Sequence, residues 1–579
     1  MEERLKKLKR LRDLQVNPYP YGFDRTHTFA EIKANFEELS QKQTIVKTAG
    51  RVIAIRGHGK TIFSTLNDEN DKIQIYLRQQ DLGENFSLFE NFDIGDFIGV
   101  EGQVFKTKTG EITIFVKNFV LLAKSLRPLP EKWHGLEDIE IRYRKRYLDL
   151  IADTVIFKCN DCGHEFACVE VGEIRCPAIK DKTTDERCGS KDIRKISMSP
   201  REIFKMRSKI ISLLRDFFNN RGFLEVETPV LQPIYGGASA RPFKTYYNAL
   251  DQEMYLRIAD ELYLKRLIVG GYEKVWELCK DFRNEGLDRF HNPEFTMIEA
   301  YQAYTDYNGM MELVEDLMEY VVKNLYSDYQ LTFQNNTIQI KRPFKRIKYV
   351  DSLNRKLNQI LALGMYLGVD VFNLSVDEIN KYCKNYGLEV VEDLAISEKI
   401  DYLIKRLVSD DKLESSVDVL KVEEEFLNQF CKRYNIQYGH LSLGGKIDKL
   451  FSELVQRDLI EPTFVIDYPK IISPLAKEHR NNPLLVERFE LIIFGLEVAN
   501  AFSELNDPIE QRKRFEEQLA HKEEGIAEID EDFLEALEYG MPPTGGLGIG
   551  VDRLCMILLN QSSIRNVILF PQLRREDAH

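Results

Sequence analysis

The 579-residue sequence contains no long apolar run, no internal repeat and no compositionally biased tract. No stretch approaches the roughly 20 apolar residues that a membrane-spanning helix needs, and the first residues, MEERLKKLKRLRDL, lack the apolar core of a secretory signal. Cysteine is scarce, nine in all, which excludes a disulfide scaffold. We therefore expect a cytoplasmic protein without a membrane segment, built from about two to four folded domains.

An excess of positive charge is also absent, because the formal net charge is −13. This argues against a protein coated in nucleic acid but allows a local basic face. Leu5, Leu8 and Leu11 recur at helical spacing among basic residues, which predicts an N-terminal helix that is either solvated or in contact with RNA. The acidic residues of this segment count against a transit peptide.

Two stretches differ from the rest in their pattern. Residues 48–122 contain five short strand-like runs separated by turn signals, which predicts a small barrel of the OB type. A proline-marked linker, SLRPLP, follows at residues 125–130. Residues 345–460 are mostly helical and charged.

Four cysteines in a short insert have the spacing of a zinc ribbon: Cys159, Cys162, Cys176 and Cys188. His164 or Cys168 could substitute for one of them. Because four thiolates leave no open coordination position, we expect a structural rather than a catalytic zinc. A metal-free remnant and a redox switch are the alternatives.

The segment from Cys279 to Tyr307 has the densest set of reactive side chains and indicates a strand, a loop and a second strand. Arg283 and Glu285, two residues apart, would share one face of the first strand, and a guanidinium can bridge a carboxylate and a phosphate. The loop and second strand add His291, Phe295, Glu299 and Tyr301. The set suits a triphosphate, an aromatic base and an ammonium, and favours nucleotide-dependent activation of a small charged molecule. A surface salt bridge and a core position for the Phe are the simpler interpretations.

Three glutamates, Glu490, Glu497 and Glu504, follow one another at intervals of seven in an otherwise apolar stretch. Since seven is odd, a straight strand would alternate their faces, and only a bulge or a turn could bring two together. Such glutamates are costly unless they are paired or bind a metal, so Glu490 and Glu497 are candidate magnesium ligands. Further on, GGLGIGVDRLCMILL lacks the Walker and Rossmann spacings. It predicts either an ordinary turn before a core helix or a close approach of backbone and Arg553 to a ligand.

Taken in order, these segments resemble a known family. GFLEVETPVL, FRNEGLDRFHNPEF and GLGIGVDR resemble motifs 1, 2 and 3 of the class II aminoacyl-tRNA synthetases. More narrowly, GGASARPF, MYLRIADELYLKRL, SPLAKEHRNNP and ALEYGMPPTGGLGIGVDR resemble segments of lysyl-tRNA synthetases. The match runs from PYPYGF to ILFPQLRR, with the cysteine insert and the middle of the helical insertion as exceptions.

The resemblance implies a role for each matching residue. Arg283 would hold the α-phosphate and the amino acid carboxylate and, with Arg553, stabilise negative charge during catalysis. The remaining ATP contacts would be Glu285 and Phe295 at adenine, His291 and Arg553 at the outer phosphates, and Glu490 and Glu497 through magnesium. The lysine contacts would be Gly237 and Glu261 at the α-amino group, Asn500 at the carboxylate, Phe502 along the stem, and Glu299, Tyr301 and Glu504 at the ε-ammonium.

Charge supports lysine as the substrate, because a buried ammonium needs compensating carboxylates and Glu299 and Glu504 supply two. The barrel resembles an anticodon reader, in which Phe63, Gln74 and Glu111 match the positions that hold the central uridine of tRNA(Lys). Without the resemblance, Phe63 would be assigned to the barrel core. No protein nucleophile is apparent, and the resemblance requires none.

The resemblance also implies an α+β fold: an OB-fold barrel, an antiparallel sheet of six or seven strands with flanking helices, an inserted zinc ribbon, and a homodimer formed through motif 1. The expected stretches are an N-terminal helix and lead-in (1–47), the OB-fold anticodon-binding domain (48–130), a hinge helix (131–158), the zinc-ribbon-like insert (159–195), a first catalytic part with motifs 1 and 2 (196–344), the helical insertion (345–460) and a second catalytic part with motif 3 (461–579).

Two other functions compete with a ligase that charges tRNA. A paralogue that transfers lysine to a protein or makes signalling dinucleotides usually lacks the barrel, which this chain has. A non-catalytic RNA-binding regulator should have lost Arg283, Glu490, Glu497 or Arg553, and all four are present.

Overall fold

The computed structural model describes residues 1–129, 138–169, 174–181, 186–367, 369, 374–386, 396–408, 417–439, 441–520 and 528–575. The chain divides into two compact units, residues 1–137 with 167–169, and residues 138–166 with 170–579. In the described part of the chain, no helix has both the length and the apolar character that crossing a bilayer requires.

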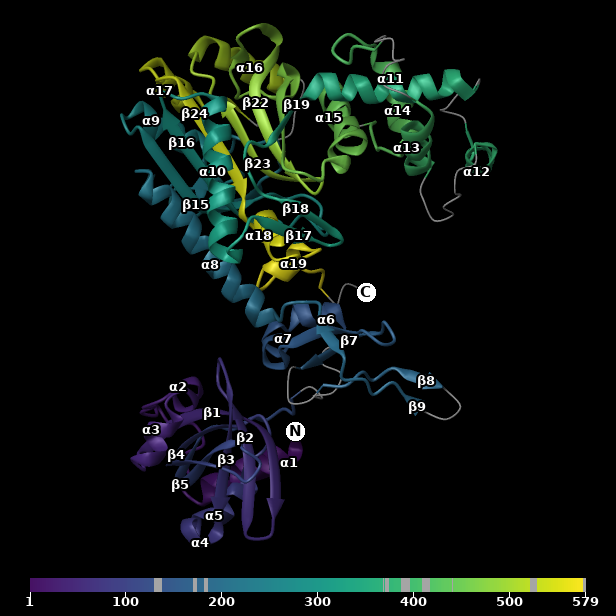
Figure 1. Cartoon of the computed structure of the whole chain (residues 1–579). Helices are drawn as coiled ribbons and strands as arrows, with labels where there is room; N and C mark the ends of the chain where they lie inside the picture. Colours follow the sequence, from purple (N-terminus) through teal and green to yellow (C-terminus); the bar gives the residue numbers. More distant parts are fainter. Residues whose placement is uncertain are drawn as a thin grey trace. The chain divides into compact units, whose positions relative to one another are not determined.

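The N-terminal unit contains a closed five-stranded barrel in the order β1-β2-β3-β5-β4, which confirms the predicted OB-type barrel (Figure 1). Its strands are β1 (Ile45–His58), β2 (Thr61–Asn67), β3 (Lys72–Arg78), β4 (Phe97–Lys106) and β5 (Ile112–Ala123). Ile73, Ile75 and Leu77 alternate into the interior and are buried, so the residues between them face outward. The parallel pairing of β3 with β5 completes the ring.

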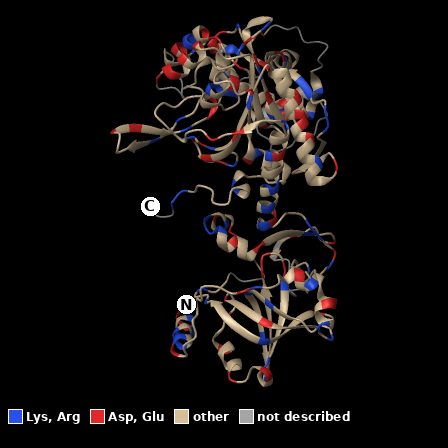
Figure 2. Cartoon of the chain, turned by 90° about the vertical axis from the view of Figure 1, so that its left-hand side faces the viewer, with Lys and Arg blue, Asp and Glu red and all other residues tan. Residues whose placement is uncertain are grey.

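Helices accompany the barrel: α1 (Glu2–Asp13), α2 (Phe29–Ala34), α3 (Phe36–Gln41), α4 (Gln79–Leu82) and α5 (Asn85–Leu88). The predicted N-terminal helix is thus present. Leu8 and Leu11 of α1 are buried, whereas Leu5 is exposed, and side chains of both signs of charge cover the rest of the helix (Figure 2). One stripe of α1 is therefore packed and the remainder is solvated.

The second unit begins with α6 (Ile139–Arg144) and α7 (Arg146–Ala152); residues 131–137 of the expected hinge helix lie outside the described residues. The cysteine insert follows as two small sheets. One has the order β10-β6-β7, and the other pairs β8 with β9. Their bounds are β6 (Thr154–Cys159), β7 (Glu165–Val169), β8 (Ile179–Asp181), β9 (Glu186–Arg187) and β10 (Ile193–Lys195).

A nine-stranded sheet is the centre of the second unit. Eight strands follow the order β11-β15-β16-β24-β23-β22-β20-β19, and the ninth, β21, pairs with β22 outside this path. The strands are β11 (Leu224–Glu225), β15 (Lys274–Phe282), β16 (Glu294–Ala303), β19 (Lys345–Lys348), β20 (Thr463–Pro469), β21 (Glu478–His479), β22 (Asn482–Ile493), β23 (Leu496–Ser503) and β24 (Thr544–Gly550). The interior pairs are antiparallel, as expected, but β11–β15 and β19–β20 are parallel. The expected six or seven strands were too few, because two-residue strands such as β11 and β21 leave no alternating pattern in a sequence.

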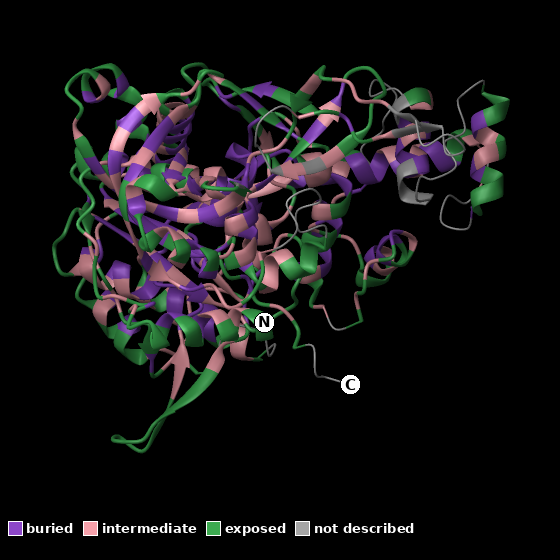
Figure 3. Ribbon diagram, turned by 90° about the horizontal axis from the view of Figure 1, so that it is seen from below, coloured by how far each residue is buried: buried purple, intermediate pink, exposed green. Residues whose placement is uncertain are grey.

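Two long amphipathic helices, α8 (Pro200–Asn220) and α10 (Tyr307–Tyr326), share the core of this sheet with the short and almost completely buried helix α18 (Val551–Leu558). Ser199 caps α8 through a capping box with Glu202, and Pro200 occupies its first turn. Phe218 stacks on Trp276 of β15 with ring centroids 4.9 Å apart. Buried residues follow the strands and the inner sides of the helices, while the loops are exposed (Figure 3).

The helical insertion builds a core of its own against β20 and β22. Its helices are α11 (Tyr349–Leu367), α12 (Val376–Asn385), α13 (Ile396–Leu407), α14 (Glu424–Arg433) and α15 (Leu443–Leu454). The remaining elements are β12 (Leu231–Gln232), β13 (Phe243–Tyr247), β14 (Gln252–Leu256), α9 (Glu261–Val269), β17 (Gln330–Phe333), β18 (Asn336–Gln339), α16 (Pro508–Ala520), α17 (Glu531–Glu538) and α19 (Ile564–Val567).

Candidate active site and nucleic-acid interface

The predicted strand–loop–strand segment is confirmed as the antiparallel pair β15–β16. One detail was wrong: β15 ends at Phe282, so Arg283 and Glu285 lie in the loop rather than on one strand face. The Arg283 amide still donates to the Pro293 carbonyl at 2.9 Å. Pro293 has no N–H to donate back to the Arg283 carbonyl, so the ladder of hydrogen bonds ends here. The Arg283 guanidinium carbon lies 5.1 Å from the centroid of the Phe295 ring. A flat cation and a flat ring therefore lie next to each other, while Glu285 is exposed.

Arg553, at the start of α18, joins three segments that are far apart in the sequence. Its guanidinium donates to Glu497 Oε2 at 3.1 Å and lies 3.2 Å from His291 Nε2. His291 Nδ1 is 2.8 Å from Asp288 Oδ2. Since the Asp288 carboxylate can only accept from Nδ1–H, Nε2 is left to accept from Arg553. Arg553, held between Glu497 and His291, therefore directs its remaining N–H donors toward one partly exposed end of the hairpin.

Glu490 of β22 and Glu497 of β23 approach each other because the register between these strands shifts at Leu491/Ile492. This is the bulge that the odd spacing required. Burial, and next the charge of Glu497, raises the pKa of Glu490 to about 8. Asp448 of α15 acts in the same direction on Glu490, and nothing in its helical surroundings distinguished it in the sequence. Carboxylate oxygens brought together in this way are the ligands that Mg²⁺ prefers.

Buried glutamates make up most of the cluster of side chains that is expected to receive the lysine side chain, called the lysine pocket below. Glu299 and Glu504 are 8% and 1% exposed, and Glu299 Oε2 accepts a hydrogen bond from Tyr301 Oη at 2.9 Å. Gly546 of β24 is required for this packing, since a Cβ there would lie 1.9 Å from Glu504 Oε1 and 2.6 Å from Tyr301 Cε1. One glycine of the GGLGIG run therefore makes room for two of the predicted contacts.

A lysine of the chain itself, Lys265, also lies in this pocket and was missed from the sequence. Its fully buried Nζ is 2.5 Å from Glu261 Oε1 and 2.5 Å from Glu504 Oε2. Burial opposes its charge, but the two carboxylates outweigh burial and raise the pKa of Lys265. The i, i+4 spacing to Glu261 on α9 was the available sequence signal, but this spacing usually indicates a surface ion pair. With Glu299 included, three glutamate carboxyl groups surround this one ammonium, and burial raises the pKa of Glu299 and, to about 8, that of Glu504.

The other predicted lysine contacts lie at the rim of the same region. Gly237 adopts φ +88°, and a Cβ there would lie 3.4 Å from Glu261 Cβ, so the glycine lies directly against this glutamate. Arg488 Nε donates to Asn500 Oδ1 at 3.1 Å, and its guanidinium carbon is 5.5 Å from the Phe502 ring centroid. Arg488, a second residue that sequence reasoning missed, orients both Asn500 and Phe502.

On the barrel, Phe63 belongs to an outward-facing aromatic cluster and not to the buried core. Its ring centroid is 4.6 Å from that of Tyr76, which in turn lies 5.9 Å from Phe115. Gln74 accepts from Thr113 Oγ1 at 2.9 Å on the neighbouring strand, and Glu111 is exposed just before β5. Half-buried rings beside amide and carboxylate groups suit the recognition of an unstacked base.

The insert brings its four predicted cysteines together. Cys159 Sγ lies 3.8 Å from Cys188 Sγ, and Cys162 Sγ lies 3.5 Å from Cys176 Sγ. One atom of each of the four lies within 4.8 Å of the others. Neither His164 nor Cys168 belongs to this group in the described part of the insert. The donor set fits a tetrahedral Zn²⁺.

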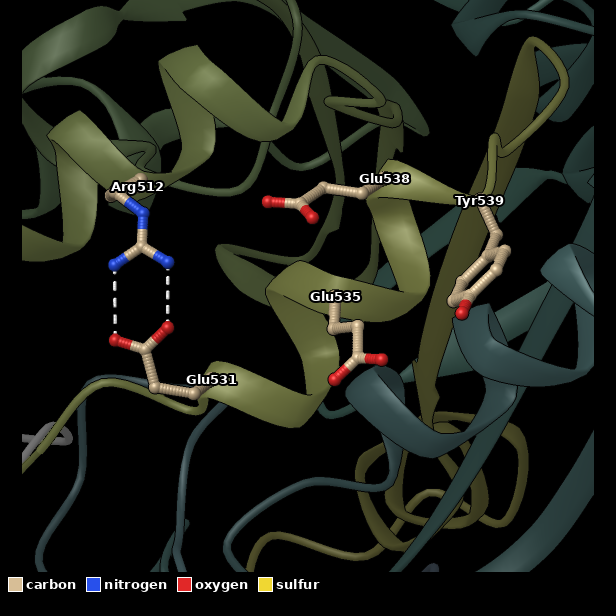
Figure 4. Close-up of a pocket in the computed structure, with 5 residues that line it drawn as sticks. All are labelled: Arg512, Glu531, Glu535, Glu538 and Tyr539. Atoms are coloured by element: carbon tan, nitrogen blue, oxygen red, sulfur yellow. Dashed lines mark hydrogen bonds and ion pairs between the residues drawn. The ribbon is translucent and has the colours of Figure 1, made fainter.

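A separate hollow lies between α16 and α17 (Figure 4). It is lined by Arg512, Glu531, Glu535, Glu538 and Tyr539, and none of the predicted site residues lines it. Arg512 donates to both oxygens of Glu531, at 3.0 and 2.6 Å. Its arginine is thus already paired, and the hollow is distinct from the carboxylate pocket.

Comparison with known families agrees with this geometry. The model described as "tRNA synthetases class II (D, K and N)" matches residues 186–574. The chain belongs to the class II tRNA synthetases. A model described as "OB-fold nucleic acid binding domain" matches residues 46–122 of this class II synthetase.

Curated relatives extend the match over the whole chain. A protein named lysine–tRNA ligase from Carboxydothermus hydrogenoformans is 45% identical, over 99% of this chain and 98% of its own length. One of the same name from Fervidobacterium nodosum is 43% identical, over 99% and 94%, and "Lysine–tRNA ligase 2" of Methanosarcina mazei is 43% identical, over 100% and 94%. The resemblance expected from the motifs is confirmed.

Proposed function

We propose that this protein is a lysine–tRNA ligase. It activates L-lysine with ATP to lysyl-adenylate and pyrophosphate, and then transfers lysine to the 3′ end of tRNA(Lys). The observation that carries the choice of amino acid is the excess of buried carboxylate over ammonium around Glu299, Glu504 and Lys265. An incoming ε-ammonium restores the balance, whereas a neutral or acidic side chain leaves it unmet.

Positioning and charge perform the chemistry. The lysine carboxylate attacks the α-phosphorus of ATP in line, and pyrophosphate leaves with the electrons of the broken P–O bond. Arg283 holds the α-phosphate and the carboxylate, with Glu285 and Phe295 at adenine, while Arg553 and His291 hold the outer phosphates. Enzymes of this class use ATP with Mg²⁺, which Glu490 and Glu497 would hold and which would neutralise phosphate charge.

The lysine is fixed at both ends. Its α-amino group contacts Gly237 and Glu261, its carboxylate contacts Asn500, and its stem packs on Phe502. Glu299, Tyr301 and Glu504 bind the ε-ammonium. Glu504 is thereby shared between the substrate ammonium and the ammonium of Lys265. The tRNA ribose hydroxyl then attacks the lysyl carbonyl and AMP leaves, so no residue of the protein becomes covalently modified.

Phe63, Gln74 and Glu111 would recognise the anticodon on the barrel, and Cys159, Cys162, Cys176 and Cys188 would hold a structural Zn²⁺. The nine unbridged thiols support a reducing compartment such as the cytoplasm.

A homodimer through motif 1 is supported by large exposed apolar side chains on and beside β11–β13: Leu224, Val230, Leu231, Tyr246, Tyr247 and Leu250. Such a patch marks a surface that another protein covers, and sedimentation would give the mass of the assembly.

Aminoacylation of tRNA with each of the twenty amino acids tests the proposal, with lysine-dependent ATP–pyrophosphate exchange measured beside it. We expect both reactions with lysine only. Exchange without charging would instead indicate a ligase that acts on another acceptor, and neither reaction would indicate a non-catalytic protein. A parallel series with a zinc chelator measures how far the ribbon contributes.

A further inference from the structure

A second group of potential metal ligands lies beneath the lysine pocket. Asp260 immediately precedes α9, and Cys279 and Asp281 share one face of β15. All three are buried, and one ligand atom from each lies within 4.8 Å of the others. Cys279 Sγ is 3.8 Å from Asp281 Oδ1. None of the three has a role in the proposed reaction.

Three of the four carboxylate oxygens of this group, both of Asp260 and Oδ2 of Asp281, are buried without a hydrogen-bond partner in the described part of the chain. Asp260 is 0% exposed, and the group that faces it is another carboxyl, that of Glu299, so no N–H donor reaches either of its oxygens in the described part of the chain. Asp281 is equally buried, and its Oδ2 has no partner there either. A buried, unpaired carboxylate is costly and is expected to bind a cation or a proton.

Neighbouring charges leave the group negative. Glu277 and Glu299 face it with two further carboxylates, and Arg257 and Arg283 supply two guanidiniums. Arg257 is 2.8 Å from Glu277 and 3.4 Å from Asp281. Because Glu299 also faces the ε-ammonium of lysine, three carboxylates remain against two guanidiniums. With the thiolate that Cys279 becomes on binding a metal, they leave an excess of two negative charges, which one divalent cation would balance; without a cation, protons on the thiol and on one carboxyl group would do so.

We propose that Asp260, Cys279 and Asp281 bind a divalent cation of the zinc type. A sulfur donor beside carboxylate oxygens favours Zn²⁺ over Mg²⁺ or Ca²⁺, which take oxygen ligands. The site would tie the start of α9, which carries Glu261 and Lys265, to the end of β15, which leads into Arg283. It is separate from the cysteines of the insert and from Glu490 and Glu497, and metal content can be measured whether or not the proposed ligase activity holds.

Metal content of the full chain, purified from zinc-supplemented medium, tests the site. We expect Asp260→Asn and Cys279→Ser each to lower the zinc content by about one equivalent per chain. Cys555→Ser is the matched control, since Cys555 is an equally buried cysteine of α18 that lies outside both metal-ligand groups of the described residues, and its zinc content should equal that of the wild type. Zinc unchanged in both cluster variants would overturn the proposal and leave protons to balance the charge.

Cobalt separates this site from the ribbon. In the full chain with Cys162→Ser and Cys176→Ser, expressed with Co²⁺, we expect about one Co²⁺ per chain and a thiolate-to-cobalt charge-transfer band. Adding Cys279→Ser should abolish the band. A ribbon variant that is folded by circular dichroism but contains no cobalt would refute the site without any substitution in the cluster itself.

Discussion

The barrel surface and the catalytic pocket use the same kinds of side chain under opposite conditions. On the barrel Phe63 is half-buried and Glu111 is exposed, whereas the pocket encloses Tyr301, Glu299 and Glu504 almost completely. When an exposed carboxylate lacks its partner, water solvates the charge and little free energy is lost. A buried carboxylate has no water to replace the partner, so the loss is large. The comparison teaches that burial, more than residue type, sets how strictly each site selects its ligand.

The largest difference between the two regions should appear when a buried carboxylate is replaced by a neutral amide. Glu299→Gln should lower kcat/KM for lysine roughly 150–5,000-fold, since loss of one partner from a buried pair costs about 3–5 kcal/mol. ATP–pyrophosphate exchange measures it. Glu111→Gln, the exposed counterpart, should leave exchange at the wild-type rate. A loss below about tenfold for Glu299→Gln would mean that this glutamate does not bind the ammonium.

A methyl group at the pocket wall tests packing without changing charge. Gly546→Ala places a Cβ 1.9 Å from Glu504 Oε1, so the carboxylate must move, and a displacement of about 1 Å can cost roughly 10²-fold. We expect this loss mainly in KM for lysine, measured by exchange. Gly57→Ala in the barrel is the matched control, because its Cβ meets nothing within 4 Å. Equal kinetics for the two variants would contradict the assigned pocket.

A substitution on the barrel should affect the transfer of lysine to tRNA and not the activation of lysine by ATP. Stacking on an aromatic side chain is worth about 1–3 kcal/mol per base, so Phe63→Ala should lower kcat/KM for tRNA charging roughly 5–150-fold. Lysine-dependent exchange should not change, because it needs no tRNA, and Phe63→Tyr should retain most charging. Impaired exchange in Phe63→Ala would show that this ring supports the fold rather than a base.

The smallest effect concerns pH at the half-buried carboxylates. Because the pKa of Glu490 is raised to about 8, the group is largely protonated at pH 6.5 and must lose its proton to bind Mg²⁺. The apparent affinity for Mg²⁺ in the exchange reaction should therefore rise with pH, by up to about tenfold per unit, and level off above pH 8. Magnesium titrations at pH 6.5, 7.5 and 8.5 measure it, and a flat profile would argue against Glu490 as a ligand.

The sequence predicted best where the pattern is local. Alternation specified the five barrel strands, and the bulge between β22 and β23 was required once Glu490 and Glu497 had to meet. Lys265 could not be assigned, because its partner Glu504 follows the end of β23, far along the chain, and only the fold of the sheet brings the two together. Arg283 was misplaced onto a strand because the end of the ladder depends on Pro293, which immediately precedes the opposite strand β16.

Lys265 also sets a rule for the design of inhibitors. One ammonium is already built into the wall between Glu261 and Glu504, so a compound with a branched or second cationic group at that depth would meet a like charge. A compound that presents a single terminal ammonium toward Glu299 and Tyr301, with an uncharged linker beside Lys265, would match the enzyme as it is folded. Permanently neutral ε-acylated lysines would leave Glu299 without a counter-charge and are expected to bind weakly.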